Sequence, residues 1–158
     1  MVSYGTNESI ERLVETYSGM LLRLARSRLN NTMDAEDAVQ EVFLYLIEHK
    51  VTFKNAEHEK AWLIRATLHR AADIGKRASK ASLPLDDACV GAQDENKSFV
   101  ADALCSLPEK YAAVLYLYYY EGYSIKEIGT VLKIPSATAG TRLSRGRTLL
   151  KKLLKEDL

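Results

Sequence analysis

The chain has 158 residues, and its content of 47% hydrophobic and 27% charged residues is typical of a folded, water-soluble protein. No apolar run approaches the roughly 20 residues that a membrane-spanning helix needs, and the N-terminus lacks a secretory-signal pattern, so we expect no membrane insertion. The formal net charge of +1 hides an uneven distribution. Residues 29–48 hold five acids and no Lys or Arg, whereas residues 60–80 and 135–155 hold six bases each.

The sequence offers no motif for catalysis or cofactor binding. The two cysteines, Cys89 and Cys105, form no CxxC pair and predict reduced thiols in a cytoplasmic protein. The three histidines have no metal-ligand spacing, and neither a phosphate-binding glycine motif nor a GxSxG nucleophile motif occurs. We therefore expect no metal, no cofactor, no small-molecule substrate and no enzymatic activity.

Helical periodicity dominates the first half of the chain and predicts three helices, with only weak strand signals. The first begins at a cap formed by Thr6 or Asn7, the second follows residues 30–32, and the third runs from a break at residues 51–55 to about Arg77. The residues expected on their buried faces are Ile10, Leu13, Val14, Tyr17, Leu21, Leu24, Ala38, Val39, Val42, Phe43, Leu46, Ile47, Ala61, Ile64, Leu68, Ala71 and Ala72.

Residues 78–97 lose this pattern and are rich in Ser, Ala, Gly and Asp, with Pro84 and Gly91 as breakers. A stretch of this length without periodicity is unusual inside one compact domain, so it predicts a linker. We therefore expect an all-α fold of two small helical domains, residues 1–77 and 98–158, joined by a flexible linker.

The second domain is predicted to contain four helices. Pro108 has the position of a proline in the first turn of a helix, and Gly122 and Pro135 mark helix ends. Ser124 and Glu127 have the spacing of a capping box, in which each side chain bonds the other residue's amide. The expected helices cover residues 99–107, 109–121 and 125–133; a final helix is capped by Ser136 and runs through Leu154.

The last two of these helices, joined by a tight turn, have the pattern of a helix-turn-helix, whose second helix enters the DNA major groove. On that helix, Ala139 and Leu143 share an apolar face, and a donor-rich polar face lies opposite. The alternative is a helical hairpin with a solvated basic face. The capping box, the turn proline and the absence of acids between residues 135 and 155 favour DNA. The polar face consists of Thr138, Thr141, Ser144, Arg145 and Thr148.

Two sets of motifs resemble the extracytoplasmic-function (ECF) sigma factors of bacterial RNA polymerase. Residues 107–111, 119–129, 132–135 and 141–147 are similar to region 4 of that family. The stretch DAEDAVQEVFL at residues 34–44, followed by AWLIRA at residues 61–66, is similar to region 2. The resemblance covers nearly the whole chain in the family's order.

The resemblance implies that the helix beginning near residue 32 docks on core RNA polymerase. An acidic face without bases suits a basic partner, although acids in a first turn also complement the helix dipole. Periodicity alone places Phe43 in the core. The matching polymerase-binding positions are Asp34, Glu36, Asp37, Gln40, Glu41, Phe43 and Leu44.

The resemblance also implies that the third helix and the loop before it bind and open the −10 promoter element, with the loop capturing a base taken out of the stack. Trp62 alternatively anchors a small core, and His69 stands where the family often has asparagine. The linker acids Asp86, Asp87, Asp94 and Glu95 would lie in a nucleic-acid channel. The implied −10 residues are Phe53, Asn55, Trp62, Arg65, His69, Lys76 and Arg77.

Region 4 would read the −35 element, and here the chain departs from the family. Gly140 replaces a frequent DNA contact, Gly146 replaces a usual alanine, and Ala112 stands where arginine is frequent. Each helical glycine costs about 1 kcal/mol relative to alanine. Specificity therefore does not transfer from relatives. The implied −35 residues are Lys126, Thr138, Thr141, Arg142, Ser144, Arg145 and Arg147.

These expectations describe a non-catalytic, cytoplasmic sigma factor that directs promoter-specific initiation. Its expected partners are core RNA polymerase and promoter DNA. Family members are often held inactive by an anti-sigma factor, which is implied as a further partner. The alternative is a helix-turn-helix regulator, or a sigma-like protein, that does not support initiation. Such a regulator has no need of the region 2 motifs.

Overall fold

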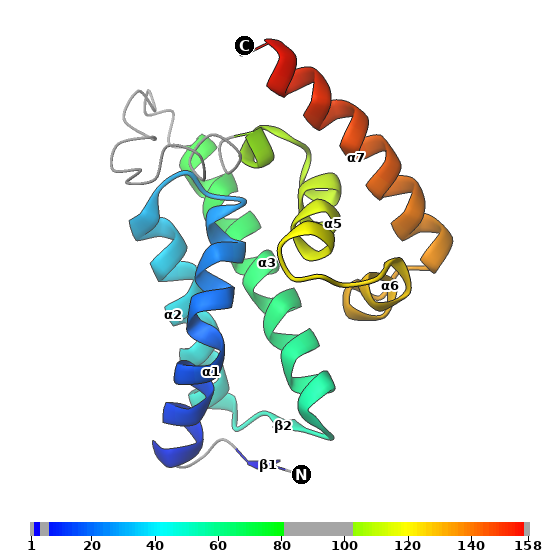
Figure 1. Ribbon diagram of the computed structural model, residues 1–158. Helices are drawn as coiled ribbons and strands as arrows, with labels where there is room; N and C mark the ends of the chain where they lie inside the picture. Colours follow the sequence, from blue (N-terminus) through cyan, green and yellow to red (C-terminus); the bar gives the residue numbers. More distant parts are fainter. Residues whose placement is uncertain (1, 4–6, 81–102, 157–158) are drawn as a thin grey trace.

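The computed structural model describes residues 2–3, 7–80 and 103–156, and in that part of the chain helices account for almost all the regular structure (Figure 1). Helices α1 (Asn7–Arg26), α2 (Thr32–His49) and α3 (Ala56–Lys80) form the first group and lie side by side. The linker acids Asp86, Asp87, Asp94 and Glu95 lie outside the described residues. The all-helical expectation is confirmed. None of the described helices is long and apolar enough to cross a membrane.

Local capping explains where α2 and α3 begin. The Asn31 side-chain carbonyl accepts a hydrogen bond from the Met33 amide at 2.8 Å, and the Asn55 side chain accepts one from the His58 amide at 2.8 Å. A short antiparallel pair of strands, β1 (Val2–Ser3) and β2 (Thr52–Phe53), lies next to the start of α3. The sequence did not predict these strands, because two residues are too few to show an alternating pattern.

The second group consists of a helical turn at residues 103–106 and the helices α5 (Glu109–Tyr119), α6 (Ile125–Leu132) and α7 (Ser136–Glu156). The predicted capping box at the start of α6 is present, with both reciprocal bonds at 3.1 Å. Lys133 ends α6 in the left-handed backbone conformation, with φ of 58°. Pro108 lies one position before α5, in the N-cap place, and not in the first turn as predicted.

The two groups of helices pack against each other through one continuous hydrophobic core. Helix α6 lies against α3, and the Arg65 guanidinium donates to the Val131 carbonyl at 2.8 Å. Arg28, two residues after α1, donates to the carbonyls of Leu104 and Leu107, both at 3.2 Å, and burial lowers the pKa of its guanidinium. The predicted domains therefore form a closed unit in this structure.

Glu121, in the turn after α5, makes polar contacts with Tyr116 of α5 and Arg23 of α1. The Tyr116 hydroxyl donates to the Glu121 carboxylate at 3.1 Å, and the same carboxylate lies 3.8 Å from the Arg23 guanidinium. Burial and the neighbouring Glu121 charge raise the pKa of Tyr116 well above its usual value. The hydroxyl therefore acts as a donor at neutral pH.

Most residues predicted to face inward are buried, but Val14 and Ile47 are errors, since 36% and 46% of their surfaces are exposed. The predicted penalty at Gly146 also has a structural explanation. A Cβ atom at Gly146 would lie 3.2 Å from a Leu115 methyl and 3.3 Å from the Tyr111 Cβ. Glycine at this position therefore allows α7 to approach α5 closely, at the cost of helix propensity.

Glu59, only 4% exposed, pairs with Arg12 at 3.2 Å, yet burial raises the pKa of its carboxyl above the usual value. Between the unfolded-state pKa of 4.5 and that raised pKa, the folded protein binds more protons than the unfolded chain. The Glu59 contribution to stability is therefore expected to increase as pH falls through the raised pKa, and to level off below 4.5.

Urea unfolding at several pH values tests this expectation by comparing wild type with Glu59→Gln. The free energy of unfolding of the wild type should gain on that of the variant as the pH is lowered from 7 towards 4.5. Glu57→Gln, at an exposed residue of the same helical turn, provides the control and should run parallel to wild type. Parallel curves for Glu59→Gln would contradict the expected titration.

Candidate functional site

The outer side of α2 presents the predicted polymerase-binding residues as one acidic face. Glu36, Asp37, Gln40 and Leu44 are exposed, and Asp34 and Glu41 are half-buried. Phe43 is 8% exposed and belongs to the core, as its periodicity indicated. No Lys or Arg occurs in α2, so nothing on this helix neutralises the acids.

This face also has an apolar part. It consists of Leu44, which was predicted to bind the polymerase, and of Ile47 and Met33, which sequence reasoning missed. Leu44 and Ile47 are 53% and 46% exposed, and Met33 is also exposed. At 100° per residue, all three lie on the same side of α2 as Asp37 and Gln40. Exposed apolar side chains bordered by acids suit a partner that offers basic groups around an apolar contact. Their spacing could have indicated this face, because Met33, Gln40, Leu44 and Ile47 follow a helical period.

A second feature is an open hollow of about 470 Å³ between α2 and α3. It brings together Trp62, Arg65 and His69, three of the residues predicted for the −10 element. Sequence reasoning missed Tyr45 and Arg70, which line the same hollow. No signal in α3 alone could have identified Tyr45, because it comes from the other helix.

Aromatic rings continue from this hollow in both directions. The Tyr45 ring stacks on His49 at 3.9 Å between centroids, and the Trp62 ring lies 6.0 Å from Tyr45 and 5.5 Å from Phe53. Phe53 is only 2% exposed, so its ring packs against Trp62 and is not accessible to DNA. Trp62 itself is half-buried, which agrees with both of its predicted roles.

The other −10 candidates make structural contacts or lie away from the hollow. Asn55 is exposed, but its side chain caps α3. Arg65 lines the hollow, and one N–H of its guanidinium donates to the Val131 carbonyl; burial lowers the pKa of this guanidinium. Lys76 and Arg77 are exposed, but at 1.5 Å per residue they lie roughly 20 Å along α3 from Trp62. The hollow and the end of α3 are therefore two separate basic places.

The exposed side of α7 gathers most of the predicted −35 residues. Thr141, Ser144 and Arg145 are exposed and Thr138 is half-buried. The Thr141 hydroxyl donates to the Ala137 carbonyl at 3.0 Å. Its oxygen can still accept a hydrogen bond, and its exposed side chain is available for contacts with a partner. Lys126, the remaining α6 candidate, is also exposed. This is the arrangement that a recognition helix needs.

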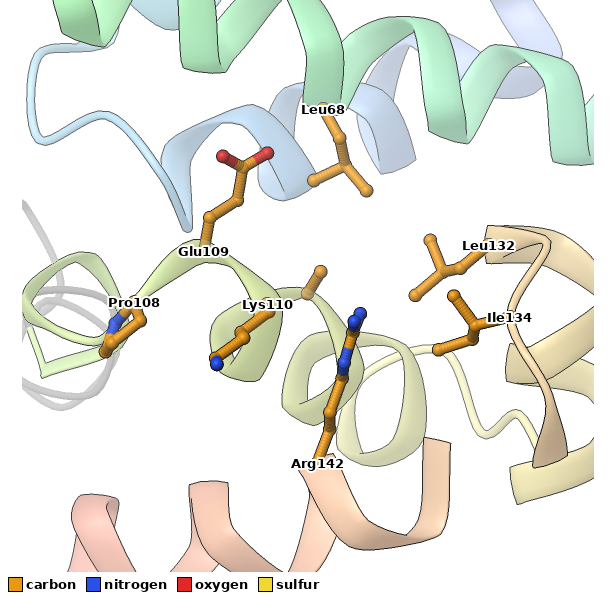
Figure 2. A pocket seen from close by; sticks show the side chains of 8 residues that line it. Leu68, Pro108, Glu109, Lys110, Leu132, Ile134 and Arg142 are labelled. Carbon is orange, nitrogen blue, oxygen red and sulfur yellow. The ribbon is translucent and has the colours of Figure 1, made fainter. Parts of the chain in front are cut away.

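Two arginines of α7 lie at the border of this exposed side and contact other parts of the protein. Arg147 donates from Nε to the Tyr119 hydroxyl at 2.6 Å, and its guanidinium lies over the Tyr118 and Tyr119 rings at 5.2 and 5.6 Å. Arg142 reaches from α7 into a groove of about 490 Å³ between α3, α5 and α6 (Figure 2). The predicted −35 residues that share the exposed side of α7 are therefore Thr138, Thr141, Ser144 and Arg145, with Arg142 at the edge; we refer to them as the predicted recognition face.

No group of three or more His, Cys, Asp or Glu side chains in the described ranges is placed to hold a metal ion. Cys105 is half-buried, and its thiol lies 3.3 Å from the Arg26 carbonyl.

The fold and these surfaces define an all-helical protein with a helix-turn-helix and an aromatic hollow on a separate helical group. Comparison with known proteins agrees with this description. Residues 13–81 match a family model described as Sigma-70 region 2, and residues 100–150 match one described as Sigma-70, region 4. Together these models cover most of the chain.

Individual relatives identify the same family. The ECF RNA polymerase sigma factor SigW of Bacillus subtilis is 27% identical over 98% of this chain and 94% of its own. The RNA polymerase sigma factor SigV of the same organism is 31% identical over 86% of each chain. The sigma factor RpoE of Bartonella quintana, solved in complex with the anti-sigma factor NepR, has the same fold, with a TM-score of 0.71 at 22% identity over 96% of this chain and 99% of its own. The chain belongs to the ECF sigma factors of the sigma-70 family.

Proposed function

We propose that this chain binds core RNA polymerase through the acidic face of α2, opens the −10 element at the hollow between α2 and α3, and reads the −35 element with α7. The single observation that carries the proposal is the hollow itself, where Tyr45, Trp62, Arg65, His69 and Arg70 meet. A helix-turn-helix alone serves many regulators. A basic hollow lined with rings on a second helical group is suited to unpaired bases.

Opening a duplex requires compensation for lost stacking. Extracting a base costs a few kcal/mol, and stacking on an aromatic side chain returns about 1–3 kcal/mol per base. Tyr45 and Trp62 supply ring surfaces at the hollow. Arg70, whose guanidinium lies 6.0 Å from the centre of the Tyr45 ring, supplies positive charge for the phosphate backbone of a DNA strand. His69 lies 3.6 Å from Asp73 and is exposed at the rim.

The closed unit limits the use of Arg65. Its Nη1 donates to the carbonyl of Val131, which belongs to the helix-turn-helix, so the whole guanidinium becomes available to a DNA strand once that bond breaks. Strand binding at the hollow is therefore coupled to movement of α6 away from α3. In the proposed cycle, binding to core polymerase separates the two groups of helices and frees Arg65.

We further propose that the chain acts in the cytoplasm and carries no catalytic activity, as a subunit that confers promoter choice on the polymerase. Its relatives carry sigma-factor names, and the RpoE fold was solved with an anti-sigma factor. We propose that an anti-sigma factor regulates this chain. Such a protein would stabilise the closed unit, in which α6 lies against α3.

Trp62→Ala is expected to lower run-off transcription from duplex promoters roughly tenfold or more, because a lost stacking contact costs about 1–3 kcal/mol. A template whose −10 region is already unpaired should restore most of that loss, since its opening no longer depends on stacking. Arg145→Ala is expected to lower run-off transcription roughly tenfold, because a contact to the −35 element is lost. A template with an unpaired −10 region should not restore this loss.

These two variants serve as controls for each other. Core-polymerase binding and thermal unfolding would show whether either variant is folded. A Trp62→Ala defect that is equal on duplex and unpaired templates would mean that Trp62 is a core anchor, and would contradict its proposed role in opening.

A further inference from the structure

A small hollow of about 260 Å³ lies between the start of α5 and the first half of α7. Helix α5 contributes Lys110 and Tyr111, and α7 contributes the remaining residues. Three of the lining side chains are cationic and none is acidic. Lys110 and Arg145 are exposed, so the hollow opens onto the same side of the protein as the predicted recognition face. The α7 residues are Ala137, Thr138, Thr141, Arg142 and Arg145.

Several features make this hollow suited to an anion. Ala137 and Thr138 belong to the first turn of α7, where amide groups lack partners within the helix and the helix dipole is positive. The Lys110 ammonium lies 5.0 Å from the centre of the Tyr111 ring, which holds it near the hollow. The neighbouring acid, Glu109, points toward α3 and away from Lys110 (Figure 2).

Helix α5 offers one basic side chain to this hollow. Lys110 is the only Lys or Arg of α5, and it lies on the exposed side of the helix. It lines the hollow together with the basic residues of α7. Lys110 is therefore the cation that α5 presents to α7.

We propose that the hollow between α5 and α7 binds a backbone phosphate of the promoter duplex beside the −35 element, with Lys110 as the ligand from α5. This inference rests on the proposed function. Thr138, Thr141 and Arg145 belong both to the hollow and to the predicted recognition face, so a duplex read by α7 brings its phosphates to Lys110. The contact is independent of base sequence and positions the duplex against α7.

The test uses holoenzyme assembled from core polymerase and the full chain. The probe is a promoter fragment recovered by its protein-dependent start site. Lys110→Ala should decrease the slope of log binding constant against log salt by about 0.9, which corresponds to a loss of roughly eightfold at 0.1 M salt. Lys110→Arg should restore binding. Lys155→Ala, at an exposed α7 residue outside the hollow, is the matched control and should have a smaller effect on binding.

A second arm uses fragments in which single phosphates flanking the −35 element are replaced by uncharged methylphosphonates. One such replacement should weaken wild-type binding and leave Lys110→Ala unaffected. An unchanged slope in Lys110→Ala would overturn the phosphate assignment. Loss of affinity for core polymerase, in place of DNA, would also overturn it, because Lys110 would then belong to a protein interface. Absence of any start site with wild type would instead overturn the proposed function.

Discussion

Asp37→Lys combined with Glu41→Lys is expected to lower the affinity of the chain for core RNA polymerase by about 100-fold, since like charges placed against each other cost several kcal/mol. Both acids lie one helical turn apart on the acidic face of α2, next to the exposed Leu44. Reversal turns the middle of that face basic while leaving its apolar residues in place. Titration of labelled protein with purified core polymerase measures the change.

The matched control is Glu11→Lys combined with Glu15→Lys. These two acids are also exposed and also four residues apart, but they lie on α1. The control changes net charge by the same amount and should leave the affinity for core polymerase within about threefold of wild type, because long-range effects of exposed charges are screened by salt. Equal losses in both double variants would mean that net charge, and not the α2 face, governs binding.

Gly129→Val is expected to reduce the free energy of unfolding by roughly 3 kcal/mol, at the upper end of the usual cost of overpacking. A Cβ atom at Gly129 would lie 2.9 Å from the Ile134 carbonyl oxygen and 3.4 Å from the Ser136 amide nitrogen. Both neighbours are backbone atoms, one in the turn after α6 and one at the first residue of α7, so the backbone between the two helices must move. For a chain of this size, the melting temperature should fall by about 6–12 °C.

Gly140→Val is the matched control because it introduces the same side chain into a helix. A Cβ atom there would meet only the Ile125 side chain, at an ordinary distance of 3.8 Å. Valine has slightly better helix propensity than glycine, so the melting temperature should stay within about 2 °C of wild type. Circular dichroism measures both. Similar losses at the two positions would contradict the close approach at Gly129.

The helices were largely predictable because their signals are local. The capping box at Ser124 and Glu127, the breaks near residues 51–55 and the apolar periodicity each depend on residues within a few positions of one another. Where prediction was wrong, the cause was also local. Periodicity identifies the direction of a buried face but not its width. It therefore predicts a buried Ile47, whereas this side chain is exposed beside the acidic face of α2.

The contacts between the two groups of helices could not be predicted. Arg65 and Val131 are 66 positions apart, and a hydrogen bond to a backbone carbonyl places no requirement on the acceptor's side chain. Tyr45 and Arg70 were not predicted for a similar reason. The residues that line a hollow between two helices can be identified only when the packing of the helices is known. Lys110 became a candidate only when the structure placed α5 across from α7.

Run-off transcription with purified core polymerase, with and without the chain, tests most directly whether this chain directs the polymerase to start transcription at promoters. The template is a promoter library, and the start sites are read by sequencing. We expect discrete start sites that require the chain and share upstream sequences at −10 and −35. Binding to core polymerase without any start site would contradict the proposed function and leave a helix-turn-helix regulator as the remaining function.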